Sequence, residues 1–291
     1  MPENIFKLKQ QMCEIGRNIW LKGFCAGNEG NHSVRIDDKR VLCTPTGISK
    51  GFLTPDMICM VDMEGNQLDH KDHGYKRTSE ILVHLAIYKK RPDIKAVIHS
   101  HPPHATAFAI AQIPIPEGIH PEAEVFLGRV PTAPYATPSK QDLPNSILPL
   151  IGPETNTVMM GNHGSVSFSR KGLIDTYYLL EILDAYCRIL LLTKQLGHAN
   201  VLNPQQMAEL LEVKQKFGMK DDRLACAATG CVGAEQNQDF FASFDVRPCC
   251  ASCGEGGTVQ QTGSASDTGM SHDEMERLVQ TITDQIVAAA R

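Results

Sequence analysis

The sequence predicts a layered α/β fold, and three observations support this expectation. Short strand-like runs separated by turn residues recur between positions 31 and 169. Residues 4–22 carry apolar side chains at spacings of three and four, which is typical of an amphipathic helix. A long and largely apolar segment follows at 171–196. Strand pairs mixed with helices of this kind form a sheet covered by helices.

Each element is predicted from its local pattern. The segment 171–196 is interrupted by Asp175, Glu181 and Asp184, so it is expected to be a buried or subunit-interface helix rather than a membrane span. The run KAVIH is apolar enough for a buried strand, and PPHATAFAIA begins a helix in which proline is tolerated in the first turn. The remaining expected elements are strands at 32–36, 40–44, 57–62 and 129–134, a helix at 78–91, and two short strands around a turn within 156–169.

Composition and charge exclude several classes of protein. The chain has 291 residues, of which 42% are hydrophobic and 21% charged, and a net charge of −5. A net negative chain is not expected to bind nucleic acid, because phosphate-backbone binding needs a cationic surface. The sequence shows neither an apolar run long enough to span a membrane nor a signal-peptide core. We therefore expect a cytoplasmic protein whose ten cysteines are reduced.

The chain is predicted to contain four parts. The body, 1–218, has the features of a catalytic domain, and 219–253 is a Cys-bearing segment. Residues 254–270 are rich in Gly, Ser, Thr and Gln, which is typical of a flexible linker. Residues 271–291 form an amphipathic helix that begins with a capping box.

Histidines at alternate positions give the first chemical signal. Successive side chains of a strand point to opposite faces, so His99 and His101 are expected to lie on the same face and can converge on one cation. His163, in MGNHG, is a third candidate ligand. Three histidines that leave a fourth position open are typical of a catalytic zinc site. The alternative is that these are structural polar residues, the interpretation that we give to His32 and His84.

Thr78-Ser79-Glu80 precedes the histidine strand and gives the second signal. Thr78 is expected to cap the helix at 78–91, and a glutamate in the first turn favours the helix dipole. This explains the segment structurally. The functional interpretation is that Glu80 lies beside the metal, as a ligand or as a proton carrier.

Two polar turns that contain glycine give the third signal. They lie at 27–31, GNEGN, and at 44–47, TPTG. Backbone N–H groups in such turns can surround a phosphate without much cationic charge. As isolated features both are also ordinary turns.

Six motifs in this order together resemble the class II aldolase and adducin head family, with the L-fuculose-1-phosphate aldolase branch nearest. The motifs are GNEGNHSVR, TPTGI, TSE, AVIHSHPPHATA, PYAT and GNHG, and the resemblance covers residues 1–200. It implies a three-layer α/β/α fold with a mixed, largely antiparallel central sheet. It also implies a homotetramer with active sites at subunit boundaries.

The resemblance assigns roles residue by residue. It implies one Zn²⁺ per subunit, bound by His99, His101 and His163, with Glu80 as the acid or base beside the metal. The phosphate-binding positions that it implies are Asn28, Gly30, Asn31, Thr46, Gly47, Thr78 and Ser79.

The implied reaction is retro-aldol cleavage of a phosphorylated ketose, of the L-fuculose or L-rhamnulose 1-phosphate type. Its products are dihydroxyacetone phosphate and L-lactaldehyde. The zinc acts as a Lewis acid on the ketose oxygens, and Glu80 protonates the carbon left after cleavage. The alternatives are a sugar-phosphate epimerase, a dehydratase or a decarboxylase on the same metal site, or a non-catalytic scaffold built on this body.

The chain departs from the family at its tyrosines. Family aldolases use one tyrosine from a neighbouring subunit and one near the C-terminus. The first is expected near 119–121, where this chain has no tyrosine, and none follows Tyr186. His120 is the candidate replacement, and the alternative is a contribution from Glu122 or Glu124 nearby.

The C-terminal parts carry separate predictions. The helix at 271–291 resembles the peptides that direct enzymes into bacterial microcompartments, which implies shell or co-cargo partners and a location inside such a compartment. The alternative is a helix that packs on its own oligomer. Five cysteines are candidates for a second metal or an iron–sulfur cluster, or else remain free thiols. They are Cys226, Cys231, Cys249, Cys250 and Cys253.

Overall fold

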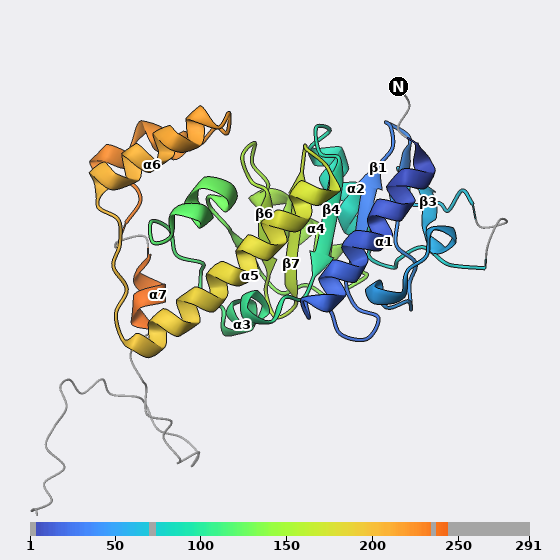
Figure 1. Cartoon of the computed structure of the whole chain (residues 1–291), viewed down its shortest axis with the longest axis horizontal. Helices are drawn as coiled ribbons and strands as arrows, with labels where there is room; N and C mark the ends of the chain where they lie inside the picture. The colour runs from blue at the N-terminus through green and yellow to red at the C-terminus, as the bar shows by residue number, and fades with distance from the viewer. Residues whose placement is uncertain (1–3, 70–73, 234–236, 244–291) are drawn as a thin grey trace, which may run out of the picture. The chain divides into compact units, whose positions relative to one another are not determined.

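A seven-stranded sheet forms the centre of this computed structural model, which describes residues 4–69, 74–233 and 237–243 (Figure 1). The strands are β1 Asn31–Arg35, β2 Arg40–Cys43, β3 Cys59–Asp62, β4 Ala96–Ser100, β5 Thr132–Ala133, β6 Thr157–Met160 and β7 Gly164–Ser169. Their order in the sheet is β3-β2-β1-β4-β7-β6-β5. All neighbours are antiparallel except β5 and β6, which are parallel. The predicted mixed, largely antiparallel sheet is confirmed.

Helices connect the strands and continue beyond them. The α-helices are α1 Ile5–Leu21, α2 Ile81–Lys90, α3 Pro103–Ala111, α4 Asp142–Ile147, α5 Leu173–Leu196, α6 Pro204–Lys216 and α7 Gln238–Ala242. Short helical turns are η1 Lys50–Phe52, η2 Pro55–Met57, η4 Leu148–Leu150, η5 Asp222–Ala225 and η6 Ala227–Thr229, and η3 Ala123–Leu127 is a π-helix. No helix within the described part of the chain has the length and apolar character to cross a membrane.

Helices cover both faces of the sheet, which confirms the layered fold. Buried residues of α1 and of the first half of α5 form one cluster with Val34 and Ile98. Buried residues of α2 and α4 form another with Val97 and Phe168. Because side chains alternate along a strand, neighbouring residues of β4 enter different clusters. The two faces of β1 and β4 therefore meet different helices.

The first helix forms as its sequence pattern predicts. Leu8, Met12, Ile15 and Ile19 are all buried on one stripe against the sheet. The side chain of Asn4 accepts hydrogen bonds from the backbone N–H groups at 6 and 7, so it satisfies donors that the helix leaves unpaired.

The helix predicted at 78–91 is shorter than expected, and Thr78 is not its N-cap. α2 begins at Ile81, and Glu80 occupies the capping position. The Thr78 hydroxyl instead accepts a hydrogen bond from the backbone N–H of Glu80 at 3.3 Å, within a turn. Thr78 N–H donates to Thr44 O at 3.0 Å, so tertiary pairing holds this residue outside the helix. Glu80 is therefore fixed immediately before the first turn of α2.

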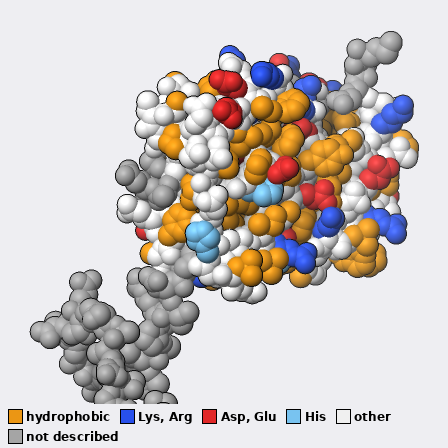
Figure 2. All heavy atoms as spheres, turned by 60° about the vertical axis from the view of Figure 1, so that its left-hand side comes forward, with side chains coloured by type: hydrophobic (Ala, Val, Ile, Leu, Met, Phe, Trp, Pro, Cys, Tyr) orange, Lys and Arg blue, Asp and Glu red, His pale blue; other side chains and the backbone are white. Residues whose placement is uncertain are grey.

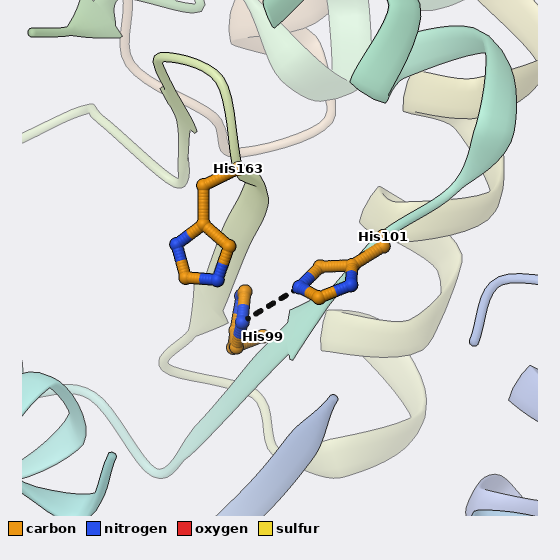
Figure 3. Close-up of side chains that lie close together, drawn as sticks. All are labelled: His99, His101 and His163. Atoms are coloured by element: carbon orange, nitrogen blue, oxygen red, sulfur yellow. Dashed lines mark hydrogen bonds between the residues drawn. The ribbon is translucent and has the colours of Figure 1, made fainter. Parts of the chain in front are cut away.

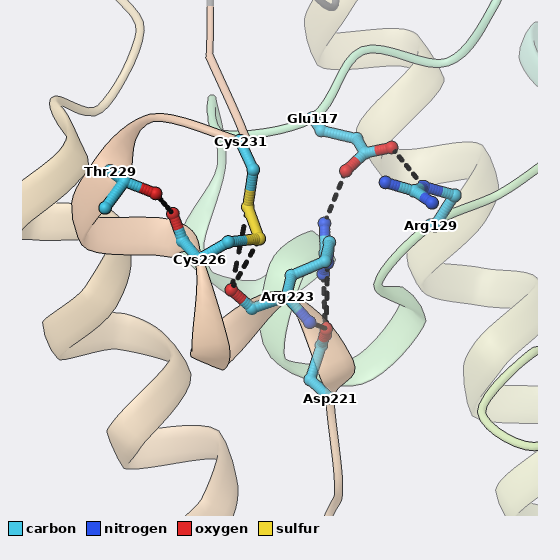
Figure 4. The surroundings of a disulfide bond; sticks show 7 residues. All are labelled: Glu117, Arg129, Asp221, Arg223, Cys226, Thr229 and Cys231. Carbon is cyan, nitrogen blue, oxygen red and sulfur yellow. Dashed lines mark hydrogen bonds and ion pairs between the residues drawn. A yellow bond between two sulfur atoms is a disulfide. The ribbon is translucent and has the colours of Figure 1, made fainter.

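Part of the Cys-bearing segment packs on the elements before it. Arg223 pairs with Glu117 at 2.7 Å (Figure 4). It also pairs with Glu124 at 2.9 Å, while Phe240 stacks on Phe108. The helix α6, which precedes this segment, was not predicted from the sequence. Its start carries an Asn203–Gln206 capping box and a proline at the first position, which are readable signals.

Cys226 and Cys231 form a disulfide, contrary to the expectation of reduced cysteines (Figure 4). Sulfurs joined to each other are not thiolate ligands, so a metal or iron–sulfur site that uses these two is not formed in this structure. The pair lies five residues apart with Cα atoms 5.6 Å from each other, within the range that a disulfide needs.

Several predictions concern positions outside the described residues. Cys249, Cys250 and Cys253 are among them, as are the linker at 254–270 and the helix at 271–291. All described residues belong to one unit, Met1–Val246.

Candidate metal centre and active site

The end of β4 supplies the first two histidines. His99 is buried within the strand, opposite Asn31 of β1 and Val166 of β7. His101 lies just beyond the strand, where its backbone N–H donates to Phe24 O at 2.9 Å. This backbone bond keeps the extended course of the chain past Ser100, so the two imidazoles still meet.

The third histidine lies in the tight turn between β6 and β7. Asn162 has a φ of 55°, and its backbone N–H donates to Ala109 O at 3.1 Å. Gly164 follows His163, and a Cβ there would lie 2.6 Å from His101 Cδ2 and 2.6 Å from Ser100 O. The turn therefore needs glycine at this position, because any side chain would displace a neighbouring histidine.

His99, His101 and His163 converge as predicted (Figure 3). One ligand nitrogen from each lies within 4.8 Å of the others. The ring centroids are separated by 4.7 to 5.0 Å, and the Nε2 atoms of His99 and His101 are 3.2 Å apart. Nitrogens this close, on rings from β4 and from the β6–β7 turn, form a three-sided arrangement around one point.

Partners behind two of the rings orient them for metal binding. His99 Nδ1 lies 2.9 Å from Ser165 O, to which it donates, so the lone pair of the ring is on Nε2. His101 Nδ1 lies 2.8 Å from Glu29 Oε2. Histidine ligands of metals commonly donate their second ring N–H to a carbonyl or a carboxylate in this way. The donor set fits a divalent cation such as zinc.

Glu80 lies against the histidines. Its Oε2 is 3.2 Å from His99 Nε2, and its Oε1 is 3.8 Å from His163 Nε2. Oε2 also accepts a hydrogen bond from Asn31 Nδ2 at 2.9 Å. The carboxylate side chain is 13% exposed, so it is nearly enclosed yet still reachable from one side. The structure thus places Glu80 beside the triad, and its role there stays a prediction.

The electrostatics of the group favour an ionised Glu80 carboxylate and neutral imidazoles at His101 and His163. Burial raises the pKa of Glu80, but the hydrogen bond and charge of His99 and the Asn31 amide outweigh it and hold this pKa well below its usual range. Burial lowers the pKa of His163 to about 4, helped by the positive potential of His99. Burial likewise lowers the pKa of His101. For His99 the nearby Glu80 carboxylate outweighs burial and raises the pKa.

The segments with predicted phosphate-binding positions lie next to one another. Lys50 Nζ donates to Asn28 O at 3.1 Å and to Ile48 O at 2.7 Å, so it joins the turn at 27–31 to the end of the second turn. Thr46 N–H donates to Lys76 O at 2.9 Å, which places the second turn beside the strand-like segment before Thr78. Gly30 and Gly47 both have a positive φ, at 70° and 75°.

The remaining predicted site residue, His120, lies in another setting. Its ring stacks on Tyr186 with centroids 5.7 Å apart, and its Nε2 is 3.4 Å from Glu122. His104, expected in the helix after the histidine strand, is indeed in α3. Its Nδ1 lies 2.8 Å from Asp184, whose other oxygen accepts the His104 backbone N–H.

Two functional side chains were not singled out by residue from the sequence. Glu29 was visible only as part of a polar turn, although an acidic residue in that turn was the available signal. His84 was assigned a structural role because its position inside α2 gives no indication of its neighbours. The structure places it 2.6 Å from Asn31, the residue that binds Glu80.

A family model described as "Class II Aldolase and Adducin N-terminal domain" matches residues 10–191. This range contains the whole sheet, the histidine triad and Glu80. The chain belongs to this family. As a member of the class II aldolase family it is an enzyme with a triad of histidines suited to a divalent metal.

Curated relatives in the family differ in their reactions. A 3-oxo-tetronate 4-phosphate decarboxylase of Haemophilus influenzae is 36% identical over 166 residues, covering 54% of this chain and 75% of its own. An L-fuculose phosphate aldolase of Methanocaldococcus jannaschii is 33% identical over 184 residues, covering 63% and 96%. A 5-methylthioribulose-1-phosphate/5-deoxyribulose-1-phosphate aldolase of Escherichia coli is 31% identical over 215 residues, covering 74% and 98%.

Solved structures agree with this assignment. A putative aldolase/epimerase/decarboxylase from Escherichia coli superposes with a TM-score of 0.65 at 26% identity, covering 71% of this chain and 98% of its own. An L-fuculose 1-phosphate aldolase superposes with a TM-score of 0.64 at 26% identity, covering 73% and 96%. The class II aldolase family fold is therefore present here in full.

Proposed function

We propose that the protein cleaves a ketose 1-phosphate by a metal-dependent retro-aldol reaction. The substrate is of the L-fuculose or L-rhamnulose 1-phosphate type, and the products are dihydroxyacetone phosphate and L-lactaldehyde. The observation that supports this most directly is the ionised Glu80 carboxylate, 3.2 and 3.8 Å from two histidine nitrogens of the triad.

The residues of the chain have distinct tasks in this reaction. A zinc ion bound by His99, His101 and His163 supplies Lewis-acid polarisation of the substrate carbonyl. In the synthetic direction the ionised Glu80 removes a proton from the carbon that attacks the aldehyde. In cleavage it first takes up a proton from solvent and then delivers it to the carbon that loses its bond to the aldehyde. The Asn31 amide holds one carboxylate oxygen, so the other faces His163 and the open side.

The phosphate is proposed to bind where the polar turns meet. Asn28, Gly30 and Asn31 come from the first turn, Thr46 and Gly47 from the second, and Thr78 and Ser79 from the segment before α2. Lys50 supports this assignment, because its buried ammonium joins the first two segments through their carbonyls. Backbone N–H groups of such turns bind phosphate without a direct cationic contact.

The aldehyde side needs a group that exchanges a proton with the substrate hydroxyl. His120 is our candidate, since the expected tyrosine is missing. An adjacent carboxylate, Glu122, lies 3.4 Å from its Nε2.

Decarboxylation of a phosphorylated 3-oxo acid is the second candidate. It shares the metal-polarised carbonyl, but its leaving group is carbon dioxide, so it needs no proton acceptor on the aldehyde side. The missing tyrosine favours this reaction, as does the 36% identity to a 3-oxo-tetronate 4-phosphate decarboxylase.

A substrate panel with matched variants tests the proposal. The zinc-loaded protein is offered L-fuculose 1-phosphate, L-rhamnulose 1-phosphate, 5-methylthioribulose 1-phosphate and 3-oxo-tetronate 4-phosphate, while dihydroxyacetone phosphate and carbon dioxide are measured. Aldol turnover should be lost on chelation and fall about 10²- to 10⁴-fold in Glu80→Gln. Glu64→Gln, an exposed surface change, is the control.

The outcomes separate the candidates. Release of dihydroxyacetone phosphate from L-fuculose or L-rhamnulose 1-phosphate supports the proposed aldolase. Carbon dioxide alone assigns the decarboxylase instead. Zinc-loaded protein that converts none of the four substrates contradicts both, and leaves epimerase, dehydratase and scaffold roles.

We further propose a homotetramer, for which exposed apolar side chains provide the support. Figure 2 shows apolar groups gathered in neighbouring areas on one face, between charged ones. Exposed apolar residues of α5 are Ile174, Tyr178, Ile189, Leu192 and Leu196. Surfaces of this kind mark interaction sites. Light scattering on the full chain gives the oligomeric state directly, and a monomeric mass contradicts the proposal.

The proposal of delivery into a bacterial microcompartment rests on residues 271–291 alone. Its support is the capping box at Ser271 and Glu274 and the apolar stripe that follows. Fusing 271–291 to a fluorescent protein in cells that form such compartments tests it. Diffuse fluorescence, with a known cargo peptide as the positive control, contradicts it.

A further inference from the structure

A line of buried polar side chains connects the Glu80 carboxylate to the interior between β1 and α2. Asn31 Nδ2 lies 2.9 Å from Glu80, and Asn31 Oδ1 lies 2.6 Å from His84 Nε2. His84 Nδ1 is 2.7 Å from the Ser33 hydroxyl, which is 2.9 Å from the Tyr88 hydroxyl. Asn31 is 5% exposed, and His84, Ser33 and Tyr88 are 0% exposed.

The fold places these groups in register. Asn31 and Ser33 are alternate residues of β1, so both side chains face α2. His84 and Tyr88 are four residues apart on α2, so they lie on one stripe of that helix and face β1. The two periodicities match, and each side chain of one element meets one of the other.

The chemistry of the groups fixes a single direction of hydrogen bonding. An ionised carboxylate only accepts, so Asn31 turns its NH₂ to Glu80 and its oxygen to His84. His84 Nε2 must then carry the hydrogen, which leaves Nδ1 as the acceptor of the Ser33 hydroxyl. The Ser33 oxygen in turn accepts from Tyr88. Every donor in this line therefore points towards the carboxylate.

We propose that His84 is a positioning residue for Glu80, acting through the Asn31 amide. An amide can rotate by half a turn at little steric cost, and it would then present its oxygen to the carboxylate. The His84 N–H prevents this rotation, because the rotated amide would place two donors against each other. His84 thereby secures the hydrogen bond that orients Glu80 between the histidines.

A wholly apolar alternative at position 84 would fill the same space. Leucine there would leave the Asn31 oxygen buried without a donor, and nothing would select the orientation of the amide. Glutamine reaches the position of Nε2 with an amide N–H and would keep the selection. The two substitutions therefore separate positioning from packing.

The first test needs no substrate and does not depend on the proposed function. In zinc-loaded protein labelled with ¹⁵N-histidine, the imidazole shifts report which ring nitrogen of His84 carries the hydrogen, and the signal is assigned by its loss in His84→Gln. We expect the hydrogen on Nε2 and the lone pair on Nδ1. A hydrogen on Nδ1 would reverse the line and overturn the proposal.

The second test is kinetic and rests on the proposed function. We expect His84→Leu to lower kcat about 10-fold or more while KM changes less than about threefold, since only the side chain of Asn31 is disturbed and the backbone N–H groups proposed to bind the phosphate stay in place. His84→Gln should recover most of kcat. His32→Leu is the matched control, because His32 is an equally buried histidine that faces the other side of β1 and bonds to Met12 O.

Each outcome decides the matter. Loss of kcat in His84→Leu, recovery in His84→Gln and near-native kcat in His32→Leu support positioning. Equal losses in all three variants, or kcat of His84→Leu within twofold of the control, overturn it. If wild-type protein converts no substrate, the proposed function has failed, and the ¹⁵N result alone decides the role of His84.

Discussion

Glu29 is the residue whose contribution to the site is easiest to isolate. Its Oε2 lies 2.8 Å from His101 Nδ1, while its Oε1 accepts the backbone N–H of Ala26. The side chain touches the metal ligand but is not itself one of the triad. Changing it therefore alters how His101 is held without removing a ligand.

We expect Glu29→Gln to weaken zinc binding about 10- to 100-fold, because the ring loses the carboxylate that orients it and increases its basicity. Competition with a chromophoric chelator gives the affinity. Glu14→Gln, on the exposed side of α1, is the control. Equal zinc affinity in the two variants would mean that Glu29 does not support His101.

His32 gives a pH dependence with a definite sign. Burial lowers its pKa to about 3, against an ordinary value of 6.5. Below pH 6.5 the unfolded chain binds a proton that the folded chain does not, so the stabilising contribution is complete above 6.5. It is lost as the pH falls towards 3.

The slope from this one group approaches about 1.4 kcal/mol per pH unit once the pH is well below 6.5. Denaturant unfolding of metal-free protein at pH 7, 6 and 5 measures it. His32→Leu should show a shallower loss of unfolding free energy over this range. Parallel pH curves for the two proteins would contradict the assignment of this acid sensitivity to His32.

At the scale of elements, the β6–β7 turn determines whether the triad can form. In this turn His163 follows Asn162, whose backbone has a positive φ, and Gly164 lies against His101. The turn between β6 and β7 is therefore constrained by the ring of His101, which follows β4. This steric contact restricts where the backbone of the turn can lie, and it does not depend on the ligand chemistry of His101.

Gly164→Ala is expected to lower both zinc affinity and stability, since its Cβ would lie 2.6 Å from His101 and from Ser100 O. Overpacking of this kind typically costs about 1–3 kcal/mol. Gly152→Ala is the control, because its Cβ would meet only Thr155 Oγ1 at 3.6 Å. Thermal melting and zinc titration of both variants measure the difference, and equal effects would refute the steric account.

An element was predicted well where the interactions that form it are local in the sequence, and poorly where they join distant residues. The helix at 5–21 and the paired strands around GNHG depend on local periodicity and turns, so the sequence predicted them closely. The predicted start of α2 was wrong because the Thr78 N–H pairs with Thr44 O, a partner far along the chain. His99, His101, His163 and Glu80 were predicted as a group, from a motif order. The partners that orient them, Glu29 and His84, come from tertiary packing that no spacing reveals.

At the scale of the whole described unit, a cluster of buried ion pairs joins the residues after α6 to the segment that contains Glu117 and Glu124. Arg223 is 4% exposed and binds Asp221, Glu117 and Glu124. Burial acts to raise the pKa of Asp221. The hydrogen bonds and positive charges of Arg223 and Lys214 outweigh this effect and hold the pKa well below its usual range. The cluster depends on all its charges being paired.

Arg223→Met should destabilise the protein by about 3–5 kcal/mol, because it leaves buried carboxylates without their cation. Arg170→Met removes an exposed pair with Glu154 and should cost less than about 1 kcal/mol. Denaturant unfolding compares the two under the same conditions. A cost for Arg223→Met as small as that for Arg170→Met would show that the cluster does not fasten this segment.

The three histidines come from separate segments, the end of β4 and the β6–β7 turn, and Glu80 beside them lies before α2. An unfolded chain cannot bring these segments together, so a cation binds the folded state alone. By mass action, free metal at 100 times its dissociation constant would add about 2.7 kcal/mol to the stability of the fold. The concentration of free ion in the surroundings therefore contributes to the stability of the fold, as well as to the occupancy of the site.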